Sequence, residues 1–319
     1  MRNILFFLSL IAFPLNALEL KRVILATNNN PLYIEFWPIV APLWQAMGLR
    51  PTLALIAGEE CPIDASIGDV IYFPPLPDVP ESLHAQVVRL FLPILFPDEG
   101  CLISDIDMIP ISRSYFQEWA SDCPDNAFLV YRNKAPGYEG GGRYPMCYLA
   151  AKGSVFGSIF GITRYEQIAE LIRSWNRAGQ GWNTDELMVY AYAKRWEAMG
   201  GNVVCLNHGV SQRLDRSDWN IDFNTLDISK YIDCHAPRPY SAYRESINRV
   251  IKAINGASQA LEQRNINLGK SINNTAIHNG MAFFLTHINQ SLNLETAVSR
   301  FNLCKEQKIK HLQSPESRD

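Results

Sequence analysis

The chain of 319 residues lacks several patterns that would assign it to a common class. Its seven cysteines include no C-x-x-C pair, which excludes the usual zinc and thioredoxin-like spacings. The formal net charge of −3 is spread without a dominant basic or acidic block, so an electrostatic grip on nucleic acid is not expected. No apolar run reaches the ~20 residues of a transmembrane helix. With 47% hydrophobic residues, the sequence is that of an ordinary globular protein.

Motifs of nucleophilic hydrolases and of phosphate-binding loops are missing as well. No G-x-S-x-G occurs, and the adjacent Cys234 and His235 would point to opposite sides of a strand. The triple glycine at 140–142 lacks the Lys-Ser/Thr that completes a P-loop. The sequence therefore gives no support to a serine or cysteine hydrolase or to a P-loop nucleotidase.

The first residues predict a secretory signal. A basic start precedes a short apolar segment at 4–15, and the small residue Ala17 follows where a peptidase could cut. Removal of residues 1–17 would place the protein in the lumen of the secretory pathway or outside the cell. The open alternative is an apolar first element of the fold, in which case the protein is cytoplasmic.

From position 21 onward, apolar runs of strand length alternate with helical patterns. Such alternation predicts a mostly parallel sheet flanked by helices, with ligands bound beyond the carboxyl ends of the strands. The predicted elements of this part are strand 21–27, helix 32–47, strand 49–57, strand 69–73, a helix capped by Ser82 and strand 101–104.

The second part continues the alternation and then becomes mainly helical and polar. The pattern predicts one domain at 21–240 and a helical extension at 241–319, whose charged tail at 305–319 has the composition of a partly disordered segment. The predicted elements are strand 127–132, a helix that opens with a capping box at 163–166 and ends near Gly179, helix 185–199, strand 202–206 and strand 231–234.

Two aspartates stand at the exit of a predicted strand, in the stretch CLISDIDMIP. Asp105 and Asp107 follow the apolar run 101–104, so both carboxylates are expected at the rim of the sheet, where they must be solvated or paired. Carboxylate oxygens suit a hard cation such as Mn²⁺ or Mg²⁺, whose remaining positions a diphosphate can fill. The alternative is a pair of solvated turn aspartates.

The run RLFLPILFPDEGCLISDIDMIPIS at 89–112 resembles the donor-binding half of GT-A-fold glycosyltransferases. In that family a helix similar to RLFLPELFP precedes a strand end similar to YLDIDMIP. The likeness is specific over 82–112 and weaker over 21–240. It implies a GT-A, Rossmann-like fold and metal-dependent transfer of a sugar from a nucleotide-diphosphate donor, with a UDP-sugar favoured, to a glycan, protein or lipid acceptor.

The resemblance also implies roles for single residues. Asp105 and Asp107 correspond to the carboxylates that hold the metal against the donor diphosphate. Arg89 is placed like a basic residue that faces the donor, with a plain surface cation as the alternative. The segment after the first strand is similar to the one that cradles the base and ribose. The implied nucleotide-binding residues are Ala26, Thr27, Asn28, Arg89 and Asp105.

Later stretches extend the likeness. Asp185 lies in a segment similar to the DQ-type segment of glycogenin-like retaining enzymes, with Glu186 in place of Gln. An acid in the first turn of a helix also stabilises the helix dipole, so a structural role for Asp185 stays open. If the glycogenin-like details carry over, transfer retains the anomeric configuration. Residues 140–153 resemble the acceptor-side loop that follows the aspartate strand.

The stretch from His235 to Arg238 resembles a shortened HxxGxxKPW ending, whose His completes the metal shell and whose base contacts phosphate. The resemblance thus implies that His235 is a metal ligand. It also implies that Arg238 is a catalytic residue whose basic side chain contacts phosphate, and that Asp185 is the second catalytic residue. His208, after another predicted strand, is the competing metal ligand.

Two other functions remain open from the sequence. A phosphatase could use a D-x-D pair as nucleophile and acid, but such enzymes usually place the pair on the first strand with a Thr shortly after, whereas Met-Ile-Pro follows Asp107 here. A non-catalytic module could keep the fold and bind a sugar or a protein, because fold does not fix function.

Overall fold

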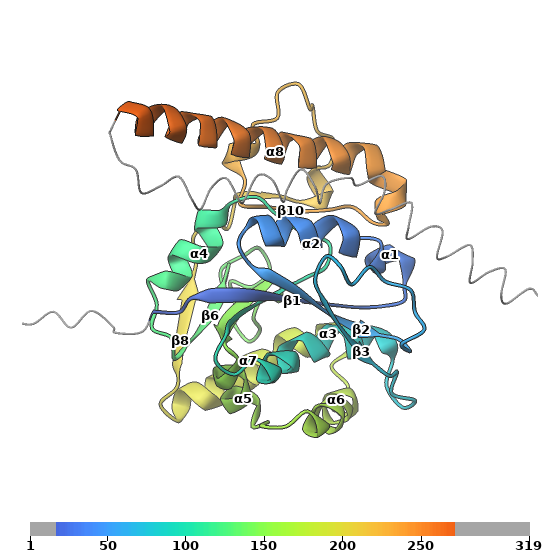
Figure 1. Ribbon diagram of the computed structural model, residues 1–319. Helices are drawn as coiled ribbons and strands as arrows, with labels where there is room; N and C mark the ends of the chain where they lie inside the picture. The colour runs from blue at the N-terminus through green and yellow to red at the C-terminus, as the bar shows by residue number, and fades with distance from the viewer. Residues whose placement is uncertain (1–16, 272–319) are drawn as a thin grey trace, which may run out of the picture.

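The computed structural model describes residues 17–271, with a seven-stranded sheet at its centre (Figure 1). The predicted signal segment, apart from Ala17, and the charged tail lie outside the described residues. In spatial order the strands are β3 (Asp69–Phe73), β2 (Arg50–Ile56), β1 (Leu20–Asn28), β4 (Gly100–Ser104), β7 (Tyr148–Lys152), β6 (Ala127–Tyr131) and β8 (Asn202–Leu206).

The sheet is mostly parallel. β1 pairs in parallel with β2 and β4, β2 with β3, and β6 with β8, while β7 runs antiparallel between β4 and β6. β4 and β6 are buried at every position, as expected for strands that are covered on both faces. The α/β class predicted from the sequence, a mostly parallel sheet flanked by helices, is confirmed.

Helices cover both faces of the sheet (Figure 1). Because side chains alternate along a strand, Val23 and Leu25 of β1 join the core on one face while Ile24 joins the core on the other. One face carries α1 (Pro31–Ile34), α2 (Trp37–Ala46) and α4 (Arg113–Ser121); the other carries α3 (Glu81–Phe91), α5 (Gly153–Phe160), α6 (Glu166–Ala178) and α7 (Thr184–Ala198).

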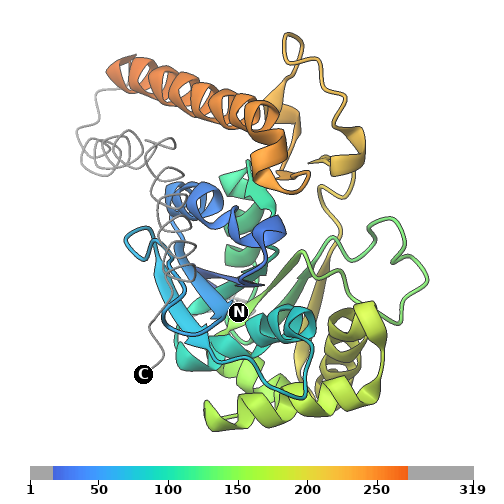
Figure 2. The same cartoon turned by 90° about the vertical axis from the view of Figure 1, so that its right-hand side faces the viewer.

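A small second sheet lies beside the first and is covered by the last described helix. It has the order β5 (Met108–Pro110), β10 (Asp233–His235) and β9 (Arg213–Leu214). The long helix α8 (Tyr240–Ser271) runs along this side of the molecule (Figure 2), and its buried Ile247 and Ile251 belong to the same core as Met108 and Cys234. None of the described helices is long and apolar enough to cross a membrane.

Several local expectations were wrong. The helix predicted at 32–47 is divided into α1 and α2, because Pro38 suits the first turn of a new helix rather than a helix interior. Residues 148–152, expected in a loop, form the central strand β7. The helix predicted to open with Thr163 and Glu166 has no such capping box; the side chain of Gln167 accepts hydrogen bonds from the amides of residues 163 and 164 instead.

Candidate active site

A cavity of about 560 Å³ opens at the carboxyl ends of β1 and β4 and reaches α3, α7 and the small sheet. It brings together nine of the ten residues that the sequence singled out for catalysis, nucleotide binding or metal binding; the competing metal ligand His208 is the exception. The lining residues are Ala26, Thr27, Asn28, Asn30, Leu32, Tyr33, Ser82, Ala85, Gln86, Arg89, Asp105, Ile106, Asp107, Met146, Trp182, Asp185, Glu186, Arg216, His235 and Arg238.

The helix α3 supplies one wall of the cavity. Ser82, Gln86 and Arg89 line it together because residues three and four apart share one face of a helix. Arg89 is only 5% exposed, so its alternative role as a surface cation is wrong. The helix begins at Glu81 and is not capped by the Ser82 side chain.

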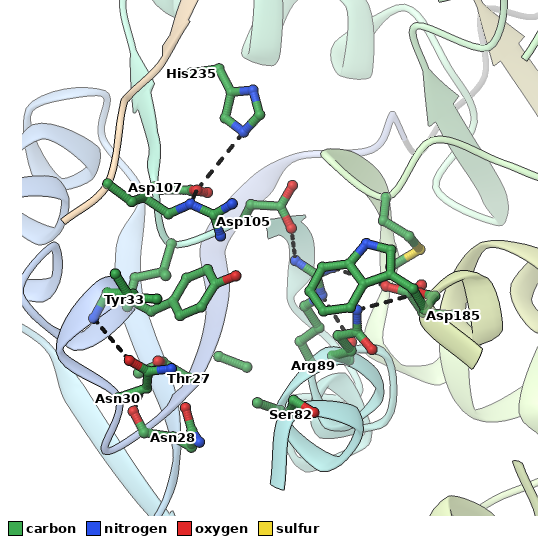
Figure 3. Close-up of a pocket in the computed structure, with 18 of the residues that line it drawn as sticks. Thr27, Asn28, Asn30, Tyr33, Ser82, Arg89, Asp105, Asp107, Asp185 and His235 are labelled. Carbon is green, nitrogen blue, oxygen red and sulfur yellow. Dashed lines mark hydrogen bonds and ion pairs between the residues drawn. The ribbon is translucent and has the colours of Figure 1, made fainter. Parts of the chain in front are cut away.

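Arg89 joins two carboxylates that are far apart in the chain. Its guanidinium donates to the Asp105 carboxylate through Nη1 and to Asp185 Oδ2 through Nη2 at 3.2 Å (Figure 3). Burial would lower the pKa of Arg89, but the two carboxylates outweigh this and raise it. Burial would likewise raise the pKa of Asp105, and the Arg89 charge more than compensates, so this pKa lies below its usual range. Arg89 and Asp105 are therefore charged at neutral pH.

Asp185 has a different environment, although it shares Arg89 with Asp105. It lies in the first turn of α7 and is 4% exposed. Burial, together with the nearby charges of Asp105 and Glu186, raises the pKa of Asp185 to about 6, against the opposing effect of Arg89. Functional sites commonly contain a buried acid whose pKa is raised.

Asp107 is the most crowded acid in the cavity. Its Oδ2 atom lies 2.9 Å from Arg216 Nη2, 3.4 Å from Arg238 Nε and 3.8 Å from His235 Nε2. The Asp107 side chain is 5% exposed, whereas those of Arg216 and Arg238 are each 27% exposed. The ion cluster is therefore open toward the cavity on its arginine side.

His235 reaches the cavity because of its place in β10. Side chains alternate along this strand, so Cys234 is fully buried while His235 lines the cavity. The ring atom Nδ1 lies 3.3 Å from Asp215 Oδ2 and 3.3 Å from Arg216 Nε, and it can donate to the first or accept from the second, but not both at once. The hydrogen bond with His235 holds the pKa of Asp215 far below its usual range.

Glu186 ties α7 to the long loop between β6 and β7, which projects from the molecule in Figure 2. The Tyr138 hydroxyl donates to Glu186, Arg143 Nη1 lies 3.0 Å from Glu186 Oε2, and the Tyr144 amide donates to the Glu186 carbonyl at 3.2 Å. This acid, next in the chain to Asp185, therefore positions the part of the loop that approaches the cavity.

The chemistry of the donor set agrees with the predicted metal, but the protein alone supplies a partial shell. Within residues 17–271, no group of three or more Asp, Glu, His or Cys side chains is arranged to hold a metal ion. Asp105, Asp107 and His235 nevertheless line one cavity, and Mg²⁺-type ions are commonly bound by one or two carboxylates plus substrate phosphates. The residues fit a metal that arrives with a phosphate ligand.

Several cavity residues were missed by the sequence analysis. The tract 28–31 was interpreted as a turn, but Asn30 caps α1, with its side chain accepting from the Leu32 amide, and Tyr33 packs under the Arg238 guanidinium at 4.5 Å. Arg216 and Trp182 lie in short 3₁₀ turns, 216–218 and 181–183, that carry no recognisable motif. The competing ligand His208 does not line the cavity; its ring stacks on Trp119 at 3.7 Å.

No protein-family model and no curated protein matches this chain. The fold is similar to solved glycosyltransferase structures. One is the galactosyltransferase LgtC in complex with donor and acceptor sugar analogues, which is 13% identical with a TM-score of 0.43, over 72% of this chain and 95% of that one. Another is GlyE of Streptococcus pneumoniae TIGR4, 10% identical with a TM-score of 0.41, over 94% of this chain and 66% of that one. Function is therefore inferred from the cavity itself.

Proposed function

We propose that the protein is a glycosyltransferase that moves a sugar from a nucleotide-diphosphate donor, with a UDP-sugar favoured, to a glycan, protein or lipid acceptor. The observation that carries this proposal is the meeting of Asp105 and Asp107 with Arg216 and Arg238 in one cavity at the carboxyl end of β4. Acids for a cation and guanidinium groups for phosphate are the two halves of a metal-diphosphate site.

The cavity also offers groups to the base, the ribose and the sugar of such a donor. The end of β1, with Thr27 and Asn28, lies across the cavity from Asp185 (Figure 3) and offers hydroxyl and amide groups to a base and ribose. Beside Asp185, the Trp182 side chain is 67% exposed and offers a flat apolar face on which a sugar ring can pack.

Transfer would proceed by cleavage of the bond between the anomeric carbon and the diphosphate oxygen, with the electron pair leaving on the diphosphate. The acceptor hydroxyl oxygen forms the new bond to that carbon, and its proton passes to the departing phosphate or to a carboxylate. Arg238 and Arg216 stabilise the charge that develops on the leaving group. A divalent cation held by Asp105 and Asp107, with His235, would supply further charge neutralisation when bound.

We assign to Asp185, which lines the cavity, the role of the carboxylate that faces the transferred sugar. Arg89 fixes its position by bridging it to Asp105. Retention of the anomeric configuration, which the glycogenin-like resemblance implies, would be read directly from the anomer of the product.

The first prediction is metal-dependent binding of a nucleotide donor. UDP-sugars, GDP-sugars, ADP-sugars and CMP-sugars are screened by thermal unfolding with and without Mn²⁺, followed by an assay for nucleotide release. One class should stabilise the protein by about 2.7 kcal/mol at a hundredfold excess over Kd, because a ligand of the folded state shifts unfolding by mass action. Asp107→Ala should abolish this shift and reduce turnover by ~10²-fold or more.

Asp98→Ala is the matched control, since Asp98 is an exposed acid that does not line the cavity. Absence of a metal-dependent shift for every donor would contradict the proposal. Binding of a donor without release of nucleotide to any acceptor or to water would favour the non-catalytic module, and activity on a simple phosphoester alone would favour the phosphatase.

A further inference from the structure

Asp107 has two positively charged neighbours before any ligand is considered. Arg216 Nη2 lies 2.9 Å and Arg238 Nε 3.4 Å from the same carboxylate oxygen, Oδ2. The acid is almost fully buried, so it needs such partners to remain charged. One carboxylate oxygen therefore holds two guanidinium groups at the place where the proposed cation would bind.

This arrangement opposes the entry of a cation alone. Three arginines, Arg89, Arg216 and Arg238, face the two acids Asp105 and Asp107. A divalent cation at Asp107 would displace or approach both guanidinium groups, and like charges at such distances repel strongly in a partly buried site. A diphosphate alone meets the opposite difficulty, because the arginines that would receive it are paired with Asp107.

Arg216 and Arg238 contact different neighbouring side chains, yet both can turn toward a ligand in the cavity. Arg238 lies over the Tyr33 ring at 4.5 Å, and Arg216 borders the His235 ring, with Nε 3.3 Å from Nδ1. Both arginine side chains line the cavity and are 27% exposed, whereas the Arg89 side chain is 6% exposed and fixed between two acids. The two partly exposed arginines are therefore the ones free to change partners.

We propose that Arg216 and Arg238 serve as exchangeable counter-ions, which hold Asp107 in the free protein and pass to the diphosphate when metal and nucleotide enter together. The exchange presupposes the metal-diphosphate site of the proposed function. Asp107 loses both guanidinium groups and gains the cation, while each guanidinium loses Asp107 and gains phosphate oxygens, so the charges stay balanced only when both ligands are present.

The consequence is strong positive coupling between metal and nucleotide. Each ligand alone must break the ion pairs of Asp107, and the second ligand then binds to groups that are already released. Coupling between two ligands is reciprocal and typically amounts to about 5–150-fold in affinity. Removal of an arginine charge should reduce this coupling in a way that a simple loss of a phosphate ligand would not.

The test measures Mn²⁺ binding to the full chain without nucleotide, by electron paramagnetic resonance of the free ion, and UDP binding with and without Mn²⁺, by calorimetry. Arg216→Gln should bind Mn²⁺ alone about fivefold or more tighter than the unaltered protein, the lower end of typical coupling. It should bind UDP in saturating Mn²⁺ more weakly. Arg216→Lys keeps the charge and should retain the weak Mn²⁺ binding of the unaltered protein. Arg177→Gln, at an exposed arginine outside the cavity, is the control.

The outcomes separate the counter-ion exchange from the proposed function. If UDP binds in a metal-dependent way but Arg216→Gln has equal or weaker affinity for Mn²⁺ alone, including no measurable binding, the exchange is wrong while the donor site stands. If no nucleoside diphosphate binds under any condition, the donor site itself is wrong. Circular dichroism of each variant establishes that it is folded, and Arg238→Gln, which should also tighten Mn²⁺ binding, provides a second variant should Arg216→Gln not fold.

Discussion

At the scale of single residues, the cavity is organised by ion pairs between arginines and acids. Arg89 joins Asp105 to Asp185, and two further arginines meet at Asp107. Such pairs remain charged in a partly buried place because the attraction between partners offsets the loss of water. The two acids consequently differ: the pKa of Asp105 lies below the usual range of an aspartate, while the pKa of Asp185 is raised to about 6.

The raised pKa of Asp185 predicts a pH dependence of stability. Because the folded-state pKa of about 6 exceeds the unfolded value near 3.8, the folded protein binds more protons than the unfolded chain between these two values. The contribution of Asp185 to the free energy of unfolding is therefore fully present below about pH 4. It is lost as the pH rises through about 6, and the loss amounts to about 3 kcal/mol.

The measurement compares urea unfolding of the unaltered protein and Asp185→Asn from pH 4 to pH 7.5. Asparagine is neutral throughout, so the stability of the unaltered protein relative to the variant should fall as the pH rises. A difference that is constant or that grows with pH would contradict a raised pKa for this acid.

At the scale of the elements, close backbone contacts fix the helices beneath the cavity. Gly153 stands where β7 passes directly into α5, and its amide donates to the Glu99 carbonyl at 3.1 Å. A Cβ atom at this position would lie 2.1 Å from the Pro93 carbonyl oxygen and 2.4 Å from that of Phe96. The turn after α3 and the start of α5 are packed against each other with no room for a side chain.

Gly153→Ala should therefore destabilise the protein by about 1–3 kcal/mol, because neighbouring backbone must shift. Gly256→Ala is the matched substitution, since Gly256 is exposed in α8 with no heavy atom within 4 Å of the added Cβ. It should stabilise by about 0.5–1 kcal/mol through the better helix propensity of alanine. The free energy of unfolding of both variants is measured with a denaturant. A destabilisation by Gly153→Ala below about 1 kcal/mol would contradict the prediction, because it would mean that the neighbouring backbone shifts at little cost.

The elements also show what could be predicted from the sequence. The strand that precedes Asp105 was predicted because its apolar run is continuous and its exit is polar, and both features are present in the fold. β7 was missed because Tyr148–Lys152 follows a glycine-rich loop and pairs with strands distant in the chain. Arg216 was beyond prediction, since it meets Asp107 across 109 positions of sequence through a loop without a motif.

At the scale of the whole molecule, the cavity lies between two sheets that share one core. Asp107 lies between β4 of the large sheet and β5 of the small sheet, and His235 belongs to β10 of the small sheet. The apolar side of α8, with Ile247 and Ile251, belongs to the same core as the buried side chains of β1 and α2. The helix that follows the cavity in the chain is therefore part of the packing that holds the small sheet in place.

This continuity predicts that α8 and the sheets unfold together. Ile247 is fully buried, and Ile247→Ala should lower the free energy of unfolding by about 2–4 kcal/mol through the lost burial and the cavity left behind. The midpoints of the urea unfolding transitions followed by far-ultraviolet and near-ultraviolet circular dichroism should both shift to lower urea concentration, by the same amount. Lys252→Ala, at an exposed position of α8, should change little. An early transition seen by only one of the two probes would indicate that α8 melts separately.

The exposed Trp182 also gives the molecule an internal optical reporter. The six other tryptophans are buried or half-buried, so Trp182 is the only one with an indole largely in water, and it stands at the rim of the cavity. A molecule that settles against the ring would remove water from it and move its fluorescence emission toward shorter wavelengths. Occupancy of the cavity could then be followed in solution, in real time and without a label.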